Sequence, residues 1–333
     1  MFPALNRKAI INRGMGLAAG MLMRQAGYRQ ELRRNGDLKL ALWRKSMRRK
    51  GAMPAKPRRF VLLPGWGDSP VSWLGVLGLL RPVFSRRYDE VVLFDFPGFQ
   101  GSLFHERGFH DMDLLMTAVH DALDTLKPTT LMGHSLGGWL SGLYAGHCGT
   151  GARPLQKNFD YKGPELLILA NPSGVFSSVT AREEWRHQIN QLIENGFDQY
   201  RKVLFVREPI WFKLFGSKIR EFFAREEVGQ FIRSVRDDQL VEPLLSSIHC
   251  KVRLLWGEQD ALIPAEWSEA WCKGLENCEC VLLRRTGHTP QMERPAVTAA
   301  VLAHFLLGKE PHRSGKYFWR IVKTSVLASA EPN

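Results

Sequence analysis

Thr130-Leu-Met-Gly-His-Ser-Leu-Gly-Gly138 combines a short apolar run with a serine that has a glycine two residues before it and two residues after it. The run predicts a buried strand, and the residues from Gly138 to Tyr144 predict a helix. A sharp turn between the two places the serine on strained backbone, where only small neighbours fit. The stretch therefore predicts that Ser135 is an exposed nucleophile, and that the backbone N–H of Leu136 faces the site where an oxyanion develops.

Similar apolar runs recur along the chain, and most are separated by segments long enough for a helix. Fully apolar strands that alternate with helices indicate an α/β fold with a mostly parallel central sheet flanked by helices. The first run begins at Phe60, just after Pro54 and Pro57, so we expect the folded core to start there. The runs cover residues 60–63, 91–94, 130–132, 166–169, 252–256 and 281–283.

Residues 173–247 interrupt this alternation, because they show helical patterning and little strand signal. We expect them to form a helical cap inserted into the core. The predicted organisation is a basic arm of residues 1–59, a core in two parts (60–172 and 248–308), and a tail of residues 309–333 that the sheet does not need. Aromatic residues recur through the cap, where they either form its own core or line an apolar acyl site: Trp185, Phe197, Tyr200, Phe205, Trp211, Phe212, Phe215, Phe222, Phe223 and Phe231.

A glycine-rich loop follows the first apolar run, with the sequence Leu63-Pro-Gly-Trp-Gly-Asp68. In folds with a serine turn of this kind, the loop after an early strand supplies the second oxyanion donor. The backbone N–H of Trp66 is our candidate for that donor. The alternative is that Gly65 and Gly67 serve only to permit a turn.

Serine needs a base within hydrogen-bond reach, and the chain offers ten histidines. In such folds the acid follows the serine along the chain and the histidine comes last. His288 follows a predicted strand, in the loop Thr286-Gly-His-Thr-Pro290, and is our candidate for the base. His304 lies in an apolar helical pattern and is expected on a helix surface, whereas His134 is expected to point away from the serine hydroxyl.

The acid is expected where the preceding strand ends, in Trp256-Gly-Glu-Gln-Asp-Ala-Leu-Ile-Pro264. This stretch offers Glu258 and Asp260. We favour Asp260, whose carboxylate would accept from His288 Nδ1 and leave Nε2 free to take the serine proton. Glu258 is interpreted as a loop or salt-bridge residue.

Taken together, these motifs resemble those of the α/β-hydrolase superfamily, especially its capped carboxylesterases, such as the pimeloyl-carrier-protein methyl ester esterase and the meta-cleavage C–C hydrolases. The resemblance implies an α/β-hydrolase fold with an inserted cap and a serine, histidine and aspartate triad. Pro64 departs from the family pattern, which commonly has histidine there. The matching pieces are Pro64-Gly-Trp-Gly67, Asp95-Phe-Pro-Gly-Phe-Gln-Gly-Ser102, Gly133-His-Ser-Leu-Gly-Gly138, Gly257-Glu-Gln-Asp-Ala-Leu-Ile-Pro264 and Gly287-His-Thr-Pro290.

The predicted function is hydrolysis of a carboxylic ester or thioester through an acyl-enzyme on Ser135. Two alternatives stay open. The same triad could serve a C–C bond hydrolase or an acyltransferase. Alternatively, the fold could be the scaffold of a non-enzymatic binding protein whose basic arm binds lipid or nucleic acid. Residues 171–247 hold eleven basic and eleven acidic residues, so no excess of positive charge indicates an anionic substrate.

Positive charge is concentrated at the start of the chain. Residues 1–59 hold sixteen Lys or Arg and two acidic residues, a net charge of +14 against +13 for the whole sequence. The apolar stretch from Gly14 to Met23 is much shorter than the roughly 20 residues that span a bilayer. Helical spacing of Ile11, Met15, Ala18 and Leu22 predicts a basic amphipathic helix, either on an anionic membrane surface or packed loosely on the body. No nucleic-acid partner is expected.

The five cysteines, an odd number without paired spacing, favour a reducing compartment. We therefore expect the protein in the cytoplasm, either free or at the inner face of the membrane. Cys278 and Cys280 lack a Cys-x-x-Cys or histidine partner and are interpreted as structural rather than metal-binding. The sequence shows no dinucleotide or phosphate loop, so no cofactor is expected.

Overall fold

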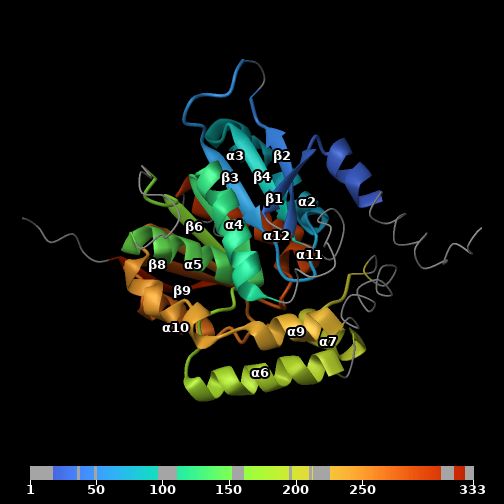
Figure 1. Ribbon diagram of the computed structural model, residues 1–333, viewed down its shortest axis with the longest axis vertical. Helices are drawn as coiled ribbons and strands as arrows, with labels where there is room; N and C mark the ends of the chain where they lie inside the picture. The colour runs from blue at the N-terminus through green and yellow to red at the C-terminus, as the bar shows by residue number, and fades with distance from the viewer. Residues whose placement is uncertain are drawn as a thin grey trace, which may run out of the picture.

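A nine-stranded sheet lies at the centre of the described chain (Figure 1). The computed structural model describes residues 18–35, 38–48, 51–96, 111–151, 161–194, 197–209, 212, 226–308 and 319–326. The strand order is β1-β2-β4-β3-β5-β6-β7-β8-β9, in which β3 to β8 are parallel and the strands at both ends are antiparallel. The strands are β1 Arg29–Asn35, β2 Leu38–Ser46, β3 Arg59–Leu63, β4 Glu90–Asp95, β5 Thr130–His134, β6 Leu166–Ala170, β7 Lys251–Gly257, β8 Asn277–Leu283 and β9 Trp319–Val326.

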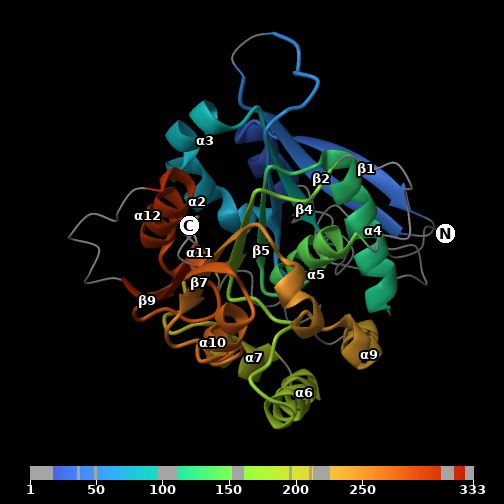
Figure 2. The same cartoon turned by 90° about the vertical axis from the view of Figure 1, so that its left-hand side faces the viewer.

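Helices cover both faces of the sheet, as Figure 2 shows. Successive strand residues point to opposite faces, so each apolar strand contributes to two cores. In β3, for example, Val61 and Leu63 belong to one buried cluster, and Phe60 and Leu62 to the other. The helices on the first face are α4 Met112–Leu126, α5 Leu136–Thr150 and α10 Trp267–Lys273; those on the second are α2 Leu74–Leu79, α3 Arg81–Arg87 and α12 Pro295–Leu307.

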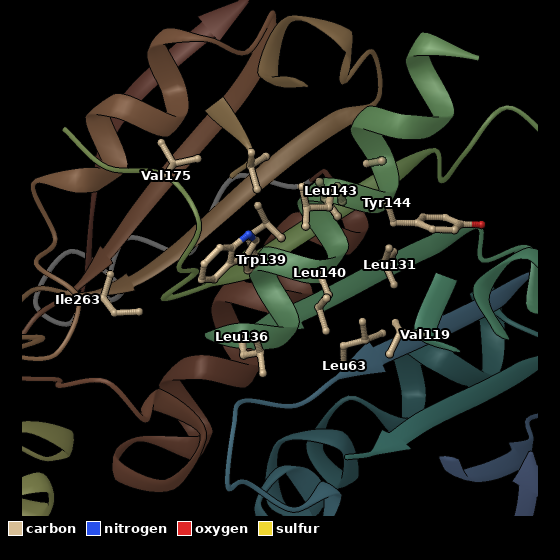
Figure 3. Packing of buried hydrophobic residues seen from close by; sticks show 14 of the residues in the cluster. Leu63, Val119, Leu131, Leu136, Trp139, Leu140, Leu143, Tyr144, Val175 and Ile263 are labelled. Atoms are coloured by element: carbon tan, nitrogen blue, oxygen red, sulfur yellow. The ribbon is translucent and has the colours of Figure 1, made fainter. Parts of the chain in front are cut away.

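Helix α5 is buried along most of its length (Figure 3). Its side chains Leu140 and Leu143 pack in one cluster with Leu63 and Leu131 of the neighbouring strands. Tyr144 donates a 3.1 Å hydrogen bond to Asp124 of α4, which satisfies a buried hydroxyl. This packing fixes the N-terminus of α5, directly after Ser135.

Between β6 and β7 the described residues form helices and turns and no strand, and the bounds 173–247 for the cap stay a prediction. Figure 1 shows the cap helices at one end of the sheet. Four aromatic residues expected in the cap, Trp211, Phe215, Phe222 and Phe223, lie outside the described residues. The cap contains α6 Val179–Glu194, α7 Phe197–Leu204, α9 Glu226–Ser234 and the 3-10 segments Asp237–Gln239 and Glu242–Ser247.

The sheet begins well before residue 60, where the core was expected to start. Residues 29–35 and 38–46, assigned above to a basic arm, form β1 and β2, and β2 pairs antiparallel with β4. Two causes favour this pairing: Leu38, Leu40 and Leu42 are buried, and Arg44 makes two 2.8 Å hydrogen bonds to Glu90. Many basic residues of the arm therefore lie on a strand pair, and residues 1–17, with Ile11 and Met15, lie outside the described residues.

The tail also differs from expectation. Residues 319–326 form β9, which pairs antiparallel with β8, although the sequence suggested that the sheet needed nothing after Gly308. An unpaired β8 would expose a row of backbone donors and acceptors, and β9 satisfies them. Tyr317 and Phe318 lie outside the described residues.

Candidate active site

Ser135 stands on strained backbone between β5 and α5. Its φ of 53° and ψ of −118° belong to a region that non-glycine residues rarely adopt. The turn is tight because small residues surround it: a Cβ on Gly133 would overlap the carbonyl oxygen of Gly137, and a Cβ on Gly137 would overlap that of Leu63. The glycines on either side of the serine are therefore required by the geometry, as the sequence predicted.

Three side chains from distant parts of the chain meet at this turn. His288 Nε2 lies 3.0 Å from Ser135 Oγ, and His288 Nδ1 lies 2.8 Å from Asp260 Oδ2. Because a carboxylate can only accept, Nδ1 carries the proton and Nε2 can accept from the serine hydroxyl. The structure thus brings together the three residues predicted from sequence, in the hydrogen-bonding order that nucleophilic catalysis requires.

The carboxylate of Asp260 is held at both oxygens. Its Oδ1 accepts from the amides of Leu262 and Ile263, both at 2.9 Å, and its Oδ2 accepts from Asn171 Nδ2 at 2.6 Å. These three donors fix the orientation of the carboxylate toward His288. Sequence reasoning missed Asn171, and the available signal was a polar residue followed by proline directly after the apolar strand β6.

The alternative residues named from sequence lie elsewhere. Glu258 pairs with Arg320 at 3.0 Å, and His304 of α12 pairs with Glu279 at 2.6 Å. His134 Nε2 lies 2.8 Å from the carbonyl oxygen of His288 and so donates away from the serine. Each of these residues has the kind of role that the sequence suggested for it.

The loop of Trp66 packs directly against the serine turn. A Cβ on Gly65 would lie 2.9 Å from His134 Nδ1 and 3.2 Å from Ser135 Cβ, so the close approach requires glycine. The Leu136 amide opens α5 and has no acceptor within the helix. The backbone donors of Trp66 and Leu136 come from the two segments that flank Ser135, and their role toward an oxyanion stays a prediction.

Comparison with known proteins decides the family. A sequence model of the alpha/beta hydrolase family matches residues 60–301. The chain belongs to the α/β-hydrolase family. This confirms the resemblance noted from the motifs, and with it the expected fold.

Relatives of this α/β-hydrolase carry hydrolase names. The human monoacylglycerol lipase ABHD6 is 21% identical over 266 residues, which cover 76% of each protein. A 2-hydroxy-6-oxononadienedioate/2-hydroxy-6-oxononatrienedioate hydrolase of Escherichia coli is 23% identical over 260 residues, covering 74% of this chain and 86% of the relative. The solved structure of a membrane phospholipase A shares the fold, with a TM-score of 0.66 and 22% identity, covering 90% of this chain and 92% of the other.

Asp68, Asp95 and His134 form a cluster of buried polar side chains next to the hydrolase site. Burial raises the pKa of Asp68 to about 6 and that of Asp95 to about 7, and it lowers the pKa of His134 to about 3. Asp68 accepts from Ser72 Oγ at 3.0 Å and from Gln291 Nε2 at 3.2 Å. Because Asp68 closes the Trp66 loop and Gln291 follows His288, this carboxylate ties the predicted oxyanion loop to the histidine loop.

Each of the described cap helices α6, α7 and α9 contacts a different loop of the predicted site. Gln188 of α6 donates a 3.3 Å hydrogen bond to the carbonyl oxygen of Ala261, next to Asp260. The carbonyl oxygen of Leu204, the last residue of α7, accepts from the His288 amide at 3.0 Å. Phe231 of α9 packs on Trp66, with ring centroids 5.1 Å apart. The cap therefore contacts the loops that hold Asp260, His288 and Trp66.

In the described part of the hydrolase, no group of three or more His, Cys, Asp or Glu side chains is arranged to hold a metal ion. Cys278 and Cys280 are buried in β8. Among the helices that the structure describes, none has both the length and the apolar character needed to cross a bilayer.

Proposed function

We propose that this α/β-hydrolase cleaves carboxylic esters or thioesters through an acyl-enzyme on Ser135. The observation that carries the proposal is the hydrogen-bonded series in which His288 lies 3.0 Å from Ser135 Oγ and 2.8 Å from Asp260. In this mechanism His288 takes the serine proton as Oγ attacks the acyl carbonyl, and then gives the proton to the leaving alcohol or thiol. Water activated by His288 releases the acid in the second half of the reaction.

The oxyanion formed at each step would lie against the backbone N–H groups of Leu136 and Trp66. Donors fixed before the reaction stabilise developing charge at no cost of reorganisation. The strained backbone at Ser135 supports this assignment, because the turn directs the first amides of α5 toward the reacting carbonyl.

The substrate that the cap favours is a neutral ester with an apolar acyl group. Buried aromatic side chains lie in the cap and at its junction with the core, among them Phe176, Trp185, Phe212 and Phe231. The balanced charge of residues 171–247 gives no preference for an anionic substrate. A monoacylglycerol, the substrate in the name of the human relative, meets both conditions.

A second candidate is hydrolysis of a C–C bond in a diketo acid, and the Escherichia coli relative is named as the hydrolase of a 2-hydroxy-6-oxo dicarboxylate. The same three side chains could serve it. Against it stands the balanced charge of the cap, because a dicarboxylate substrate calls for a surplus of Arg or Lys. A purely binding function is disfavoured by the intact hydrogen bonds of the triad.

We further propose that the N-terminal segment brings the enzyme to an anionic membrane surface, at the cytoplasmic face. In the helix at residues 18–25, Ala19 and Met23 are buried, whereas Met21 and Leu22 are 56% and 48% exposed. Exposed Arg24 lies on the same helix, within a region of net charge +14. Exposed apolar side chains beside basic ones are what an interfacial helix presents to acidic lipids.

The hydrolase proposal is tested with a chain-length series of p-nitrophenyl acyl esters, a monoacylglycerol and a diketo acid, using wild type and Ser135→Ala. We expect wild type to hydrolyse the esters and Ser135→Ala to lose activity by roughly 10⁶-fold, as removal of the nucleophile does in other triads. Cleavage of the diketo acid without any ester hydrolysis by folded wild type would transfer the assignment to the C–C hydrolases.

The membrane proposal is tested by co-sedimentation with phosphatidylserine vesicles and with phosphatidylcholine vesicles. Deleting residues 1–55 is unsuitable, because β1 and β2 would be lost. The double variant Met21→Glu, Leu22→Glu should instead abolish binding to phosphatidylserine vesicles. Ile321→Glu, at a 43% exposed apolar residue of β9, serves as the matched control and should bind as wild type does. Equal binding by all three proteins contradicts the proposal.

A further inference from the structure

Glu293 connects the cap to the loop of His288. It ends the short helix α11 Pro290–Glu293, five positions after the histidine. Its Oε1 accepts from the Gly287 amide at 2.8 Å, and its Oε2 accepts from the amides of Val206 and Arg207 at 2.9 and 3.1 Å. One carboxylate thus holds an amide of the histidine loop and two amides of the cap segment that follows α7.

The same two segments also meet through the backbone of His288. The His288 amide donates to the carbonyl oxygen of Leu204 at 3.0 Å. The approach is so close that a Cβ on Gly287 would lie 2.9 Å from that oxygen and 3.0 Å from Glu293 Oε1. Glycine before the histidine is therefore what lets the cap segment reach the loop.

The two peptide groups of His288 are held from opposite sides. On the core side, His134 Nε2 donates to the His288 carbonyl oxygen at 2.8 Å. On the cap side, Leu204 accepts from the His288 amide, and Glu293 accepts from the amide one residue earlier. The core and the cap thus each supply one part of the frame that keeps Nε2 at 3.0 Å from Ser135 Oγ.

The environment of Glu293 is suited to this task. Burial raises the pKa of its carboxyl group, while the backbone amides of Arg207, Gly287, Val206 and Thr289 act in the opposite direction. Amides that converge on one carboxylate make charge-assisted hydrogen bonds, which are shorter and stronger than neutral ones. The two cap amides come from a solvent-exposed segment, so their hydrogen bonds to Glu293 form only where this segment lies against the core.

We propose that Glu293 is a positioning residue through which the docked cap segment 204–207 holds His288 in register with Ser135. The proposal rests on the proposed function, because His288 is taken as the base. When the segment lifts, Glu293 and the His288 amide lose their cap partners together, and proton transfer from Ser135 slows. The cap then regulates turnover as well as substrate access.

The test compares Glu293→Gln and Glu293→Ala with wild type, and uses Glu258→Gln as the matched control. Glu258 also lies in a loop at the end of the sheet, but it pairs with Arg320. With p-nitrophenyl butyrate we expect kcat to fall roughly 10–100-fold in Glu293→Ala, with KM within about threefold of wild type, the pattern of a lost transition-state interaction. Glu293→Gln keeps one acceptor oxygen and should recover part of the loss, and Glu258→Gln should behave as wild type.

A perturbation from the cap side makes the test independent of the carboxylate. Val206→Pro removes one of the two cap N–H donors to Glu293. We expect it to lower kcat as well, and we expect the double variant Glu293→Ala, Val206→Pro to be little worse than Glu293→Ala alone, because both changes break one interaction. If the losses of the two single variants add fully in the double variant, the proposal is contradicted.

The second readout does not depend on activity. The proton shared by His288 Nδ1 and Asp260 gives a downfield resonance when the ring is held in place, and this resonance should broaden or disappear in Glu293→Ala. An unchanged resonance and unchanged kcat in a folded variant overturn the inference. If wild type hydrolyses no ester, the proposed function fails, and the resonance still decides whether Glu293 positions His288.

Discussion

Asn171 donates a 2.6 Å hydrogen bond to the oxygen of Asp260 that also faces His288. The amide side chain and the imidazole therefore converge on one carboxylate oxygen, while the other oxygen accepts two backbone amides. Asn171 is fully buried and has a φ of 45°, a left-handed conformation in which asparagine is enriched among non-glycine residues. Asn171 therefore holds the Asp260 carboxylate in place, and no sequence motif names it.

Asn171→Ala should lower kcat/KM by roughly 10–100-fold. A hydrogen bond to a charged group is worth about 1.5–3 kcal/mol, and about 1.4 kcal/mol corresponds to tenfold in rate. Without this donor, the Asp260 carboxylate is held at one oxygen only, so it orients His288 Nδ1 less well. Steady-state kinetics with an ester substrate check the loss. A kcat/KM equal to that of wild type would rule out the support role.

Asp260→Asn should lower kcat by about 10⁴-fold, which is the loss seen when the corresponding aspartate of a serine protease triad is changed to asparagine. The neutral amide neither stabilises the imidazolium nor fixes the tautomer in which Nδ1 carries the proton. Glu258→Gln is the matched control two residues away, and it should stay within about threefold of wild type because Glu258 pairs with Arg320. Similar losses in both variants would make Glu258 a candidate for the acid again.

Gly65→Ala should impair catalysis more than folding. The added Cβ would lie 2.9 Å from His134 Nδ1 and 3.2 Å from Ser135 Cβ, so the predicted oxyanion loop must move outward. We expect kcat to fall by roughly 10²–10³-fold, the usual effect of losing one oxyanion donor. At Gly78 of α2 an added Cβ meets nothing within 4 Å, so Gly78→Ala should keep full activity and raise Tm by about 2 °C.

Asp95→Asn should change how stability depends on pH. Burial raises the pKa of Asp95 to about 7, so the native state binds this proton more tightly than the unfolded state. The contribution of Asp95 to the free energy of unfolding therefore decreases as the pH rises from about 4 to about 7, and Asp95 destabilises the native state fully above pH 7. Asparagine has no ionisable group, so its contribution does not change with pH. The Tm of the variant minus that of wild type should increase from pH 5 to pH 8, and a constant difference would contradict the prediction.

The triad could be predicted from sequence because its positions are set by local backbone requirements. Glycines mark the serine turn, and apolar strands end just before the loops that hold Asp260 and His288. The parallel strands from β3 to β8 are buried on both faces, so each reads as a continuous apolar run. The piece Asp95 to Ser102, which also matched the family, lies outside the described residues from position 97 onward.

The outer strands were missed for the opposite reason. β1 has the sequence Arg-Gln-Glu-Leu-Arg-Arg-Asn and lies at the edge of the sheet. Charged side chains on an edge strand oppose pairing with a strand of another molecule. In β2, Leu38, Leu40 and Leu42 do alternate, but the lysines and arginines around them read as a surface segment. Antiparallel pairing with β4 decided the outcome, and a single sequence does not show pairing.

Asn171 and Glu293 illustrate what local patterns omit at the site. Each is one polar residue whose partners lie far along the chain: Asn171 reaches Asp260, and Glu293 reaches Val206. Neither has a spacing that separates it from an ordinary loop residue. Their roles follow from the three-dimensional meeting of the cap with the carboxyl ends of the strands.

The contacts of Gln188, Leu204 and Phe231 with the three catalytic loops limit how this enzyme can be recombined. Grafting the cap of a relative onto this core would replace the cap residues and would also remove the contacts that they make with Ala261, His288 and Trp66. We expect such a chimera to be slow unless the loops that contact the cap are exchanged with it. The cap and these three loops therefore form one unit for engineering, and a change in the cap requires a compensating change in the loops.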